Sequence, residues 1–403
     1  MATILCVWEL GIDLGHLSTL RLPVELALSQ GHSVVMALRE SHNAQRVFGD
    51  WPIRYLQAPF RGNSAQTNVT PIPSFTHLLI RQCFESVVEL VGYLNAWRQL
   101  YDEVKPDLVL FEHSPTALIA AYGCPFKKIL IGNGFTAPPG QQSPGSPFVP
   151  FPTTSALPAV WQGLMQDDVE VLKLINTARS QLNLSHLPNM HAIFGQTDHC
   201  FLMTWPMLDP FGPRNGATYL GIEPPRPATP PIWPHAVGPK IFGYLHAFPA
   251  LVPLLQNLQS CNARAVLFIR NLPPNVRDAF EGSCLSFVDQ PVDLNSVARE
   301  AHWVINHGNH STAAYFVAQG VPQLFIPLHQ EHLFLARNVV RQGAAVLGYQ
   351  DQADFAELVK ELCACESYRK NALIVSQSCD RIHADAVRHH MARVIQLFTN
   401  APM

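Results

Sequence analysis

Residues 305–336 decide the fold of this chain, and they read INHGNHSTAAYFVAQGVPQLFIPLHQEHLFLA. The run Trp303-Val304-Ile305 just before them is apolar and typical of a short strand, and it ends at a polar turn that contains a glycine. A helix is expected through Ala313 to Gln319, because a Gly-Val-Pro sequence then interrupts the helical pattern. Gln323 to Ile326 is a second apolar strand, and Glu331 opens another helix. The stretch therefore predicts one strand–helix–strand unit of a parallel sheet, followed by a helix.

The loop between the first strand and the first helix is rich in hydrogen-bond donors. It runs from His307 to Thr312, and the hydroxyls of Ser311 and Thr312 can cap the helix that follows. Successive backbone N–H groups and the positive end of a helix suit a phosphate or a diphosphate. Open α/β sheets bind ligands at the carboxyl ends of their strands, where this loop lies. The sequence therefore predicts an anion site here.

These residues carry a resemblance to a known family. Residues 307–336 resemble the nucleotide-diphosphate-binding signature of GT-B glycosyltransferases, in the family 1 group of UDP-glycosyltransferases and of macrolide and glycopeptide glycosyltransferases. The resemblance implies an α/β fold of GT-B type, with two facing Rossmann-like domains, a ligand cleft between them and a C-terminal helix that crosses back to the N-terminal domain. The positions that match the family pattern are His307, Ser311, Thr312, Gly320, Pro322, Pro327 and Glu331.

Composition indicates a well-buried globular protein with two domains, because the chain has 403 residues, of which 48% are hydrophobic and 14% charged. A net charge of −3 without a cluster of Lys or Arg argues against a nucleic-acid partner. The nine cysteines contain no Cys-x-x-Cys pair and are typical of free thiols in a reducing compartment. A strand from Thr3 leaves no room for a signal peptide, and no apolar run approaches the ~18 residues of a membrane span. We therefore expect a cytoplasmic protein without an integral membrane segment.

Strand-like runs alternate with helical patterns in both halves of the chain, which predicts Rossmann-like domains with parallel sheets. Pro23 predicts a kink or a late start in the first helix, and Gly92 a break in the long helix of residues 75–104. The expected strands are residues 3–8, 33–38, 53–57, 108–111, 129–131, 240–245, 265–269, 285–288, 303–305 and 324–326, and the other expected helices are residues 17–30, 116–122, 167–182 and 380–398.

Two proline-rich stretches mark loops or linkers. Residues 136–160 form either a plain surface loop or one that shapes a binding site, and residues 223–239 are the best candidate for an interdomain linker. The domains expected are an acceptor-binding domain at 1–222, the linker at 223–239, a nucleotide-sugar-binding domain at 240–379 and a C-terminal crossing helix at 380–403.

His16 is the candidate catalytic base. It follows the first strand in Gly15-His16-Leu17, where the resembling families carry a catalytic His. An imidazole can accept a proton at neutral pH. The plain alternative is a His that caps the following helix. Glu112 ends the strand at 108–111 and is expected at the same sheet edge, where it can hold the other ring nitrogen; His113 is the neighbouring alternative.

The resemblance places the donor on the second domain. The diphosphate-binding residues it implies are His307, Gly308, Asn309, His310, Ser311 and Thr312, with Asn309 in the place of a glycine. Glu331 and His332 are expected to bind the donor sugar, although the family commonly has Gln where this chain has His332.

The nucleoside-binding residues expected are Phe287, Gln290 and Tyr315. Tyr315 stands where many UDP-using members carry a ribose-binding Glu. Some thymidine-diphosphate users resemble this chain in lacking that Glu, so UDP and dTDP donors both stay open.

The sequence is therefore interpreted as an inverting, metal-independent hexosyltransferase-type glycosyltransferase. It would move a sugar from a UDP- or dTDP-sugar, which is a substrate and not a cofactor, to a hydroxyl of a small acceptor. The apolar helix pattern at 75–104 and the proline-rich loop favour a hydrophobic acceptor such as a polyketide, an aromatic compound or a lipid. A homodimer is compatible with the sequence.

Three other interpretations stay open. The pairs His307/His310 and His329/His332 suggest a metal site, but no Cys or cluster of carboxylates accompanies them. The glycines after the first strand suggest an oxidoreductase, although the third glycine of a dinucleotide fingerprint is missing. The third is a catalytically degenerate GT-B protein that serves as an accessory or binding subunit.

Overall fold

The structure is a computed structural model, and it describes residues 1–12, 14–62, 72–141, 145–351, 354–364, 366–379 and 384–399. The chain forms two compact units. Unit 1 contains Met1–Leu220 and Ile382–Met403, and unit 2 contains Gly221–Arg381. No helix of the described residues is long and apolar enough to span a membrane.

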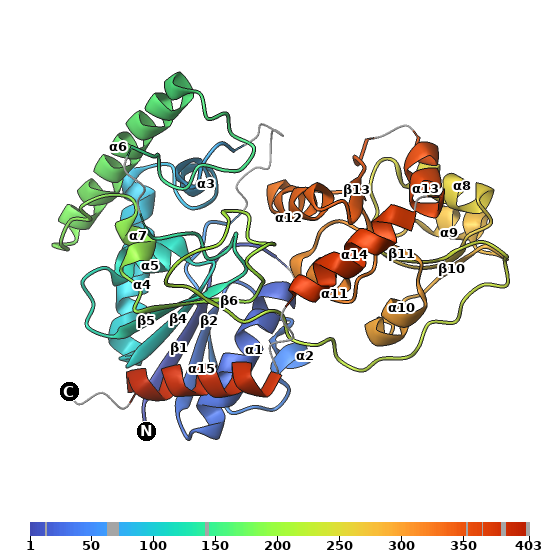
Figure 1. Cartoon of the computed structure of the whole chain (residues 1–403). Helices are drawn as coiled ribbons and strands as arrows, with labels where there is room; N and C mark the ends of the chain where they lie inside the picture. The colour runs from blue at the N-terminus through green and yellow to red at the C-terminus, as the bar shows by residue number, and fades with distance from the viewer. Residues whose placement is uncertain are drawn as a thin grey trace. The chain divides into compact units, whose positions relative to one another are not determined.

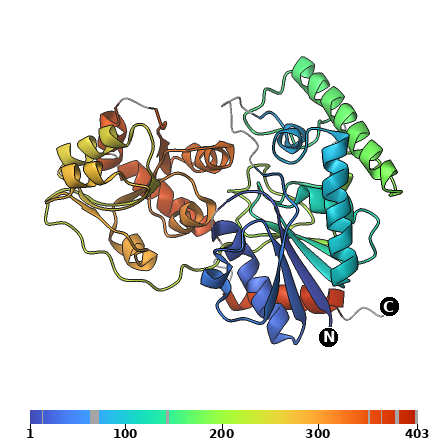
Figure 2. The ribbon, with the colours of Figure 1, turned by 180° about the vertical axis from the view of Figure 1, so that it is seen from behind.

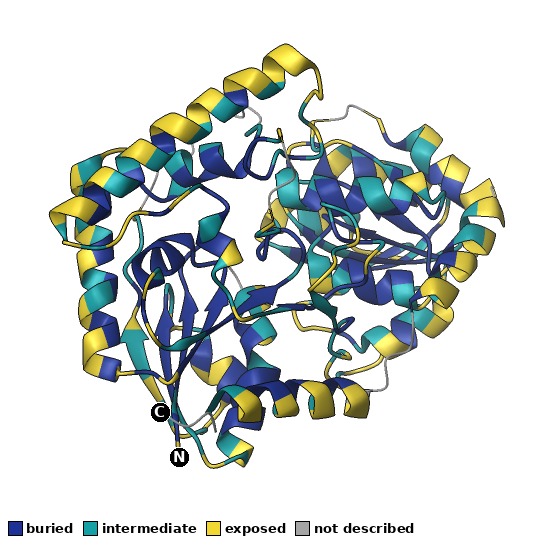
Figure 3. Cartoon of the chain, turned by 60° about the vertical axis from the view of Figure 1, so that its left-hand side comes forward, coloured by how far each residue is buried: buried dark blue, intermediate teal, exposed yellow. Residues whose placement is uncertain are grey.

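Unit 1 is built on a seven-stranded parallel sheet with the strand order β3-β2-β1-β4-β5-β6-β7. The order reverses between β1 and β4, and ligands bind at such a reversal in open α/β sheets. The central strands are buried on both faces, which explains why they are nearly continuous apolar runs (Figure 3). The strands are β1 Thr3–Trp8, β2 Ser33–Leu38, β3 Ile53–Gln57, β4 Leu108–Glu112, β5 Lys127–Gly132, β6 His199–Leu202 and β7 Thr218–Tyr219.

Helices cover this sheet, and several of them differ from the sequence prediction. The helix expected at 167–182 begins at Pro158, and the helices at 44–48 and 192–195 were not expected. The expected long helix is two helices, because Ser86 accepts a hydrogen bond from the Glu89 N–H at 3.2 Å and starts a new helix there, whereas Gly92 lies inside it. Pro23 lies within the first helix, so the alternative of a late start is wrong. The helices are α1 Leu14–Ser29, α2 Ala44–Phe48, α3 Phe75–Gln82, α4 Val87–Val104, α5 Pro115–Ala121, α6 Pro158–Gln181 and α7 Ala192–Gly195.

The helix α15 (Ala384–Thr399) returns to unit 1 and packs against α1, as Figures 1 and 2 show. Met391 and Ile395 are fully buried in the core that α1 and the sheet share. Arg388 donates to Glu25 at 2.5 Å, and Gln30 donates to the Ala392 carbonyl at 2.9 Å. The expected crossing helix is thus confirmed, although residues 380–383 and 400–403 of its predicted range lie outside the described residues.

Unit 2 repeats the design with a six-stranded parallel sheet in the order β10-β9-β8-β11-β12-β13, which reverses between β8 and β11. Its strands are β8 Lys240–His246, β9 Arg264–Arg270, β10 Leu285–Phe287, β11 Trp303–Asn306, β12 Gln323–Phe325 and β13 Ala345–Leu347. Its helices are α8 Leu251–Ser260, α9 Pro274–Phe280, α10 Leu294–Glu300, α11 His310–Ala318, α12 Gln330–Arg341, α13 Ala356–Ala364 and α14 Glu366–Ser378. The prediction of an α/β protein with two parallel sheets is confirmed. The strands β6, β7 and β13 were not expected.

Candidate active site

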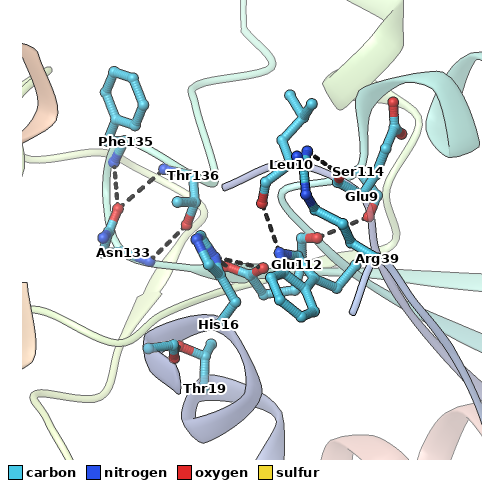
Figure 4. Close-up of polar contacts among 12 residues, drawn as sticks. Glu9, Leu10, His16, Thr19, Arg39, Glu112, Ser114, Asn133, Phe135 and Thr136 are labelled. Atoms are coloured by element: carbon cyan, nitrogen blue, oxygen red, sulfur yellow. Dashed lines mark hydrogen bonds and ion pairs between the residues drawn. The ribbon is translucent and has the colours of Figure 1, made fainter. Parts of the chain in front are cut away.

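His16 and Glu112 meet at the point where the sheet of unit 1 reverses its strand order. β1 and β4 pair in a register that sets Trp8 beside Glu112, and His16 lies in the first turn of the helix after β1. Nδ1 of His16 lies 2.9 Å from Glu112 Oε2 and 3.1 Å from Oε1 (Figure 4). An ionised carboxylate only accepts, so Nδ1 donates in this contact, and Nε2 is the ring nitrogen that can act as a base.

The His16 ring is held between two other rings. Trp8 stacks on one side with ring centroids 5.2 Å apart, and His113 stacks at 5.7 Å. Gly11 has a φ of +84°, and a Cβ at this position would come within 2.0 Å of His16 Nε2. Only glycine therefore allows the loop after β1 to approach the imidazole this closely.

A second carboxyl group, near the His16–Glu112 pair, has a structural role that the sequence did not reveal. Glu9 is 1% exposed, and burial raises its pKa to about 8 despite hydrogen bonds from the backbone N–H groups of Thr116 and Ala117. The Glu9 carboxyl group accepts hydrogen bonds from the first backbone N–H groups of α5. Arg39 donates to the Glu9 carbonyl at 3.4 Å, which ties β2 to this edge (Figure 4).

The turn after β5 is built by local hydrogen bonds. The Asn133 side chain accepts from the N–H groups of Phe135 and Thr136 at 2.9 and 3.0 Å, and Thr136 Oγ1 accepts from the Asn133 N–H at 3.1 Å (Figure 4). This turn sets the Phe135 ring against the His113 ring in a T-shaped contact, with the ring centroids 6.0 Å apart. The Asn-x-x-Thr pattern is the sequence signal from which the turn could have been predicted.

In unit 2, the helix after β11 begins at His310, with Asn309 at its N-cap. The prediction that Ser311 and Thr312 cap a later start is wrong, because both lie in the first turn. The first amides of an α-helix have no acceptor within the helix, so the N–H groups of His310, Ser311 and Thr312 form the positive end of this dipole. The prediction of an anion site at this loop stays a prediction.

The structure gives the His307 ring a different contact from the expected one. The side chain is 0% exposed, Nδ1 donates to the Ile326 carbonyl at 2.6 Å, and Nε2 accepts from the His246 N–H at 2.8 Å. Burial lowers the pKa of His307 to about 4, so the ring is neutral. Both nitrogens are used inside the protein, and the expectation that the ring itself touches a diphosphate needs correction. His307 ties the ends of β8, β11 and β12 together.

Gly308 and His332 lie against each other behind the loop. Gly308 has a φ of +93°, and a Cβ there would come within 2.8 Å of the His332 carbonyl oxygen. His332 is 6% exposed, and burial and neighbouring imidazoles lower its pKa well below the usual value. Its ring lies 3.6 Å from that of His329, centroid to centroid. Glu331, in the first turn of α12, is half-buried.

The residues expected to bind the nucleoside lie in different places. A cavity of about 320 Å³ at the carboxyl ends of β9 and β10 is lined by Phe287, and Arg277 beside it donates to the Phe287 carbonyl at 2.8 Å. Gln290 is exposed on the bend after β10. Tyr315 is a core residue, 6% exposed, whose hydroxyl donates to Asn295 at 3.0 Å, so it does not line this cavity.

The pairs His307/His310 and His329/His332 were the candidate metal ligands. Within the described residues, no group of three or more His, Cys, Asp or Glu side chains is arranged to hold a metal ion. The ring centroids of His329 and His332 lie 3.6 Å apart, and the two ring planes are tilted by 33°.

The fold was compared with known proteins. The chain matches solved glycosyltransferases over nearly its whole length. One of them is the glycosyltransferase of kitacinnamycin, with a TM-score of 0.68, 16% identity and 99% of each chain covered. This chain has the GT-B fold. SnogD from Streptomyces nogalater matches at a TM-score of 0.64 and 16% identity, covering 98% of this chain and 99% of that one. VinC in complex with dTDP matches at 0.63 and 15% identity, covering 99% and 100%. No family model and no curated protein matches the sequence.

Proposed function

We propose that the protein is an inverting glycosyltransferase that moves a sugar from a nucleoside diphosphate sugar to a hydroxyl of a small, hydrophobic acceptor. The observation that carries the proposal is the His16–Glu112 pair at the strand-order reversal of unit 1. Two rings hold the base, a carboxylate orients it, and it is 13% exposed, so it is restrained but reachable. A base of this kind typically contributes about 10²–10⁴-fold to a rate.

In the proposed reaction, Nε2 of His16 takes the proton of the acceptor hydroxyl. The acceptor oxygen then attacks the anomeric carbon of the donor as the bond from that carbon to the diphosphate oxygen breaks. Glu112 stabilises the imidazolium through Nδ1, as carboxylates do in other His-dependent sites. A single displacement of this kind inverts the anomeric configuration.

The donor is proposed to lie along the carboxyl edge of the sheet in unit 2. The N-terminal amides of α11 would receive the diphosphate, and a preorganised helix end of this kind stabilises a departing anion. The cavity beside Phe287 would take the nucleoside. Glu331, at the start of α12, would accept hydrogen bonds from the hydroxyls of the sugar. No cofactor or metal is part of this scheme.

Both UDP and dTDP remain candidate nucleotides, and dTDP is favoured. Tyr315 occupies the position at which many of the resembling UDP-using enzymes carry a ribose-binding Glu, and it is buried in the core. The complex of VinC with dTDP, a property of that protein, supports the same choice. Thermal unfolding with UDP and with dTDP would separate the two, and a clear preference for UDP would remove the dTDP proposal.

A second candidate is a catalytically degenerate GT-B protein that acts as an accessory subunit. The departures from the family pattern at Asn309, Tyr315 and His332 favour it, whereas the intact His16–Glu112 pair favours an enzyme. Slow hydrolysis of a nucleotide sugar by the purified protein, measured as released nucleoside diphosphate, distinguishes them. A protein that binds nucleotide sugars without any hydrolysis or transfer would fit the accessory subunit.

A further inference from the structure

Two cysteines of unit 2 meet where two helices pack together. Cys261 directly follows α8, Cys363 lies in the last turn of α13, and these two helices lie side by side (Figures 1 and 2). Both residues are free thiols, and a hydrogen bond joins their side chains although they lie far apart in the sequence. The two sulfur atoms are therefore close neighbours in the folded protein.

The helices that carry this pair are held to each other and to the core of unit 2. Asn257, one turn before Cys261, accepts a hydrogen bond of 2.9 Å from the Phe355 N–H just before α13, and Phe355 is fully buried. Cys261 packs against the hydrophobic core that contains Leu362, the residue before Cys363. A disulfide requires a narrow range of geometry, so helices in a fixed relation favour a bond between sulfurs that are already in contact.

The two thiols differ in exposure and in acidity. Cys363 is exposed, whereas Cys261 is half-buried and its Sγ lies 3.3 Å from the Leu258 carbonyl oxygen. The hydrogen bond from Cys261 lowers the pKa of Cys363 to about 7, and the neighbouring Trp303 indole acts in the same direction. The same hydrogen bond and burial raise the pKa of Cys261. The thiolate is the reactive form of a cysteine, so Cys363 is the nucleophile of the pair and Cys261 is the partner that resolves it.

We propose that Cys261 and Cys363 form a reversible disulfide when the protein meets a peroxide, and that this bond fastens α13 to α8. In compartments that keep thiols reduced, the disulfides that do form are mostly transient redox switches. The stability of unit 2 would then respond to oxidation, since a cross-link between two distant positions restricts the unfolded chain. The proposal does not depend on the proposed transferase function.

The oxidation takes place in two steps. The Cys363 thiolate attacks one oxygen of the peroxide, the O–O bond breaks, and the departing hydroxide takes up the proton that Cys363 had released, which gives water. The Cys261 sulfur then attacks the sulfenic acid on Cys363, the S–O bond breaks, and the S–S bond forms as a second water leaves with the Cys261 proton. Two thiols are oxidised to one disulfide while one peroxide is reduced to water.

Peptide mapping tests the bond directly. The Cys365→Ser variant is the background throughout, because Cys365 shares the tryptic peptide 361–369 with Cys363. The protein is treated with a small excess of hydrogen peroxide near neutral pH, its remaining thiols are alkylated, and it is digested with trypsin without reduction. We expect the peptides 241–264 and 361–369 to be joined with the loss of two hydrogen atoms, and dithiothreitol to release both. The melting temperature should rise by several degrees on oxidation and return on reduction.

Three substitutions in this background give the controls. Cys363→Ser and Cys261→Ser are expected to abolish the joined peptide and the temperature shift, whereas Cys284→Ser, on a half-buried cysteine of the same unit, keeps both. Recovery of Cys261 and Cys363 as free thiols, or of Cys363 as a sulfinic acid without the joined peptide, overturns the proposal. A joined protein that melts at the same temperature as the reduced one would show that the bond does not fasten the two helices.

Discussion

Glu112 Oε2 lies 2.9 Å from Nδ1 of His16, although 96 residues separate the two side chains. The parallel register of β1 with β4 produces this contact, because it ends both strands side by side where the strand order reverses. Glu112 is 2% exposed at its side chain, so the pair is shielded from solvent on the carboxylate side. A shielded hydrogen bond of this kind fixes the tautomer of the imidazole.

The Glu112 carboxylate should contribute to the rate of sugar transfer and not to binding of the donor. Glu112→Gln keeps the size of the side chain but removes its charge, so the imidazolium formed during transfer loses its stabilising partner. We expect kcat to fall about 10–100-fold, with unchanged protection by the nucleoside diphosphate in thermal unfolding. Glu40→Gln, on a half-exposed residue, is the matched control. An unchanged kcat for Glu112→Gln would show that the contact of Glu112 with His16 does not contribute to catalysis.

The close approach of Gly11 to the base predicts a second effect. Gly11→Ala places a methyl group where His16 Nε2 now lies and imposes a left-handed conformation that costs about 1–2 kcal/mol. The ring must therefore move, and activity should be lost while the protein still folds, with a lowered melting temperature. The control is Gly15→Ala, since no atom lies within 4 Å of a Cβ there. Equal activity of the two variants would contradict this placement of the ring.

The loop that leads into α11, where we propose that the diphosphate binds, predicts a third effect, on nucleotide binding. Gly308→Ala would bring a methyl group within 2.8 Å of the His332 carbonyl and disturb the backbone that leads into α11. We expect protection by UDP or dTDP to be lost, whereas Gly282→Ala, with open space around its Cβ, keeps it. Protection that survives in Gly308→Ala would place the diphosphate elsewhere.

Glu9 predicts a dependence of stability on pH. Its folded-state pKa of about 8 lies above the 4.5 of a free side chain, so the folded protein holds a proton that the unfolded chain releases. Stability contributed by this group is therefore complete below pH 4.5 and declines as the pH rises to 8. Glu9→Gln should have the same melting temperature as the wild type at about pH 5 and a higher melting temperature than the wild type at about pH 8.5. Parallel curves at all pH values would show that Glu9 is not buried as a neutral group.

The sequence predicts the strands of this fold well because parallel strands are buried on both faces. The runs at 3–8 and 33–38 match β1 and β2 because these strands are nearly continuous apolar runs that are buried in the core. The run at 53–57 matches β3, an edge strand in which polar Arg54 and Gln57 are exposed. The contact of His16 with Glu112 was foreseeable for the same reason, since both follow adjacent strands to one edge.

Other features have no local signature. His307 is sequestered because its partners are backbone groups near residues 246 and 326, and a sequence does not reveal which carbonyl a ring will meet. His113 has a φ of +41°, and its carbonyl accepts from the Leu10 N–H at 3.0 Å, a contact between segments that are far apart in the sequence. Only the folded chain brings these segments together, so these contacts could not be predicted from residue patterns.

The central claim is that His16 removes the acceptor proton during sugar transfer. The most direct test compares the wild type, His16→Ala and the exposed-histidine control His42→Ala on a panel of UDP- and dTDP-sugars, with released nucleoside diphosphate and glycosylated product measured by mass spectrometry. The account predicts that His16→Ala loses about 10²–10⁴-fold of the rate while it keeps nucleotide protection and His42→Ala keeps both. Transfer by His16→Ala at the wild-type rate would contradict it.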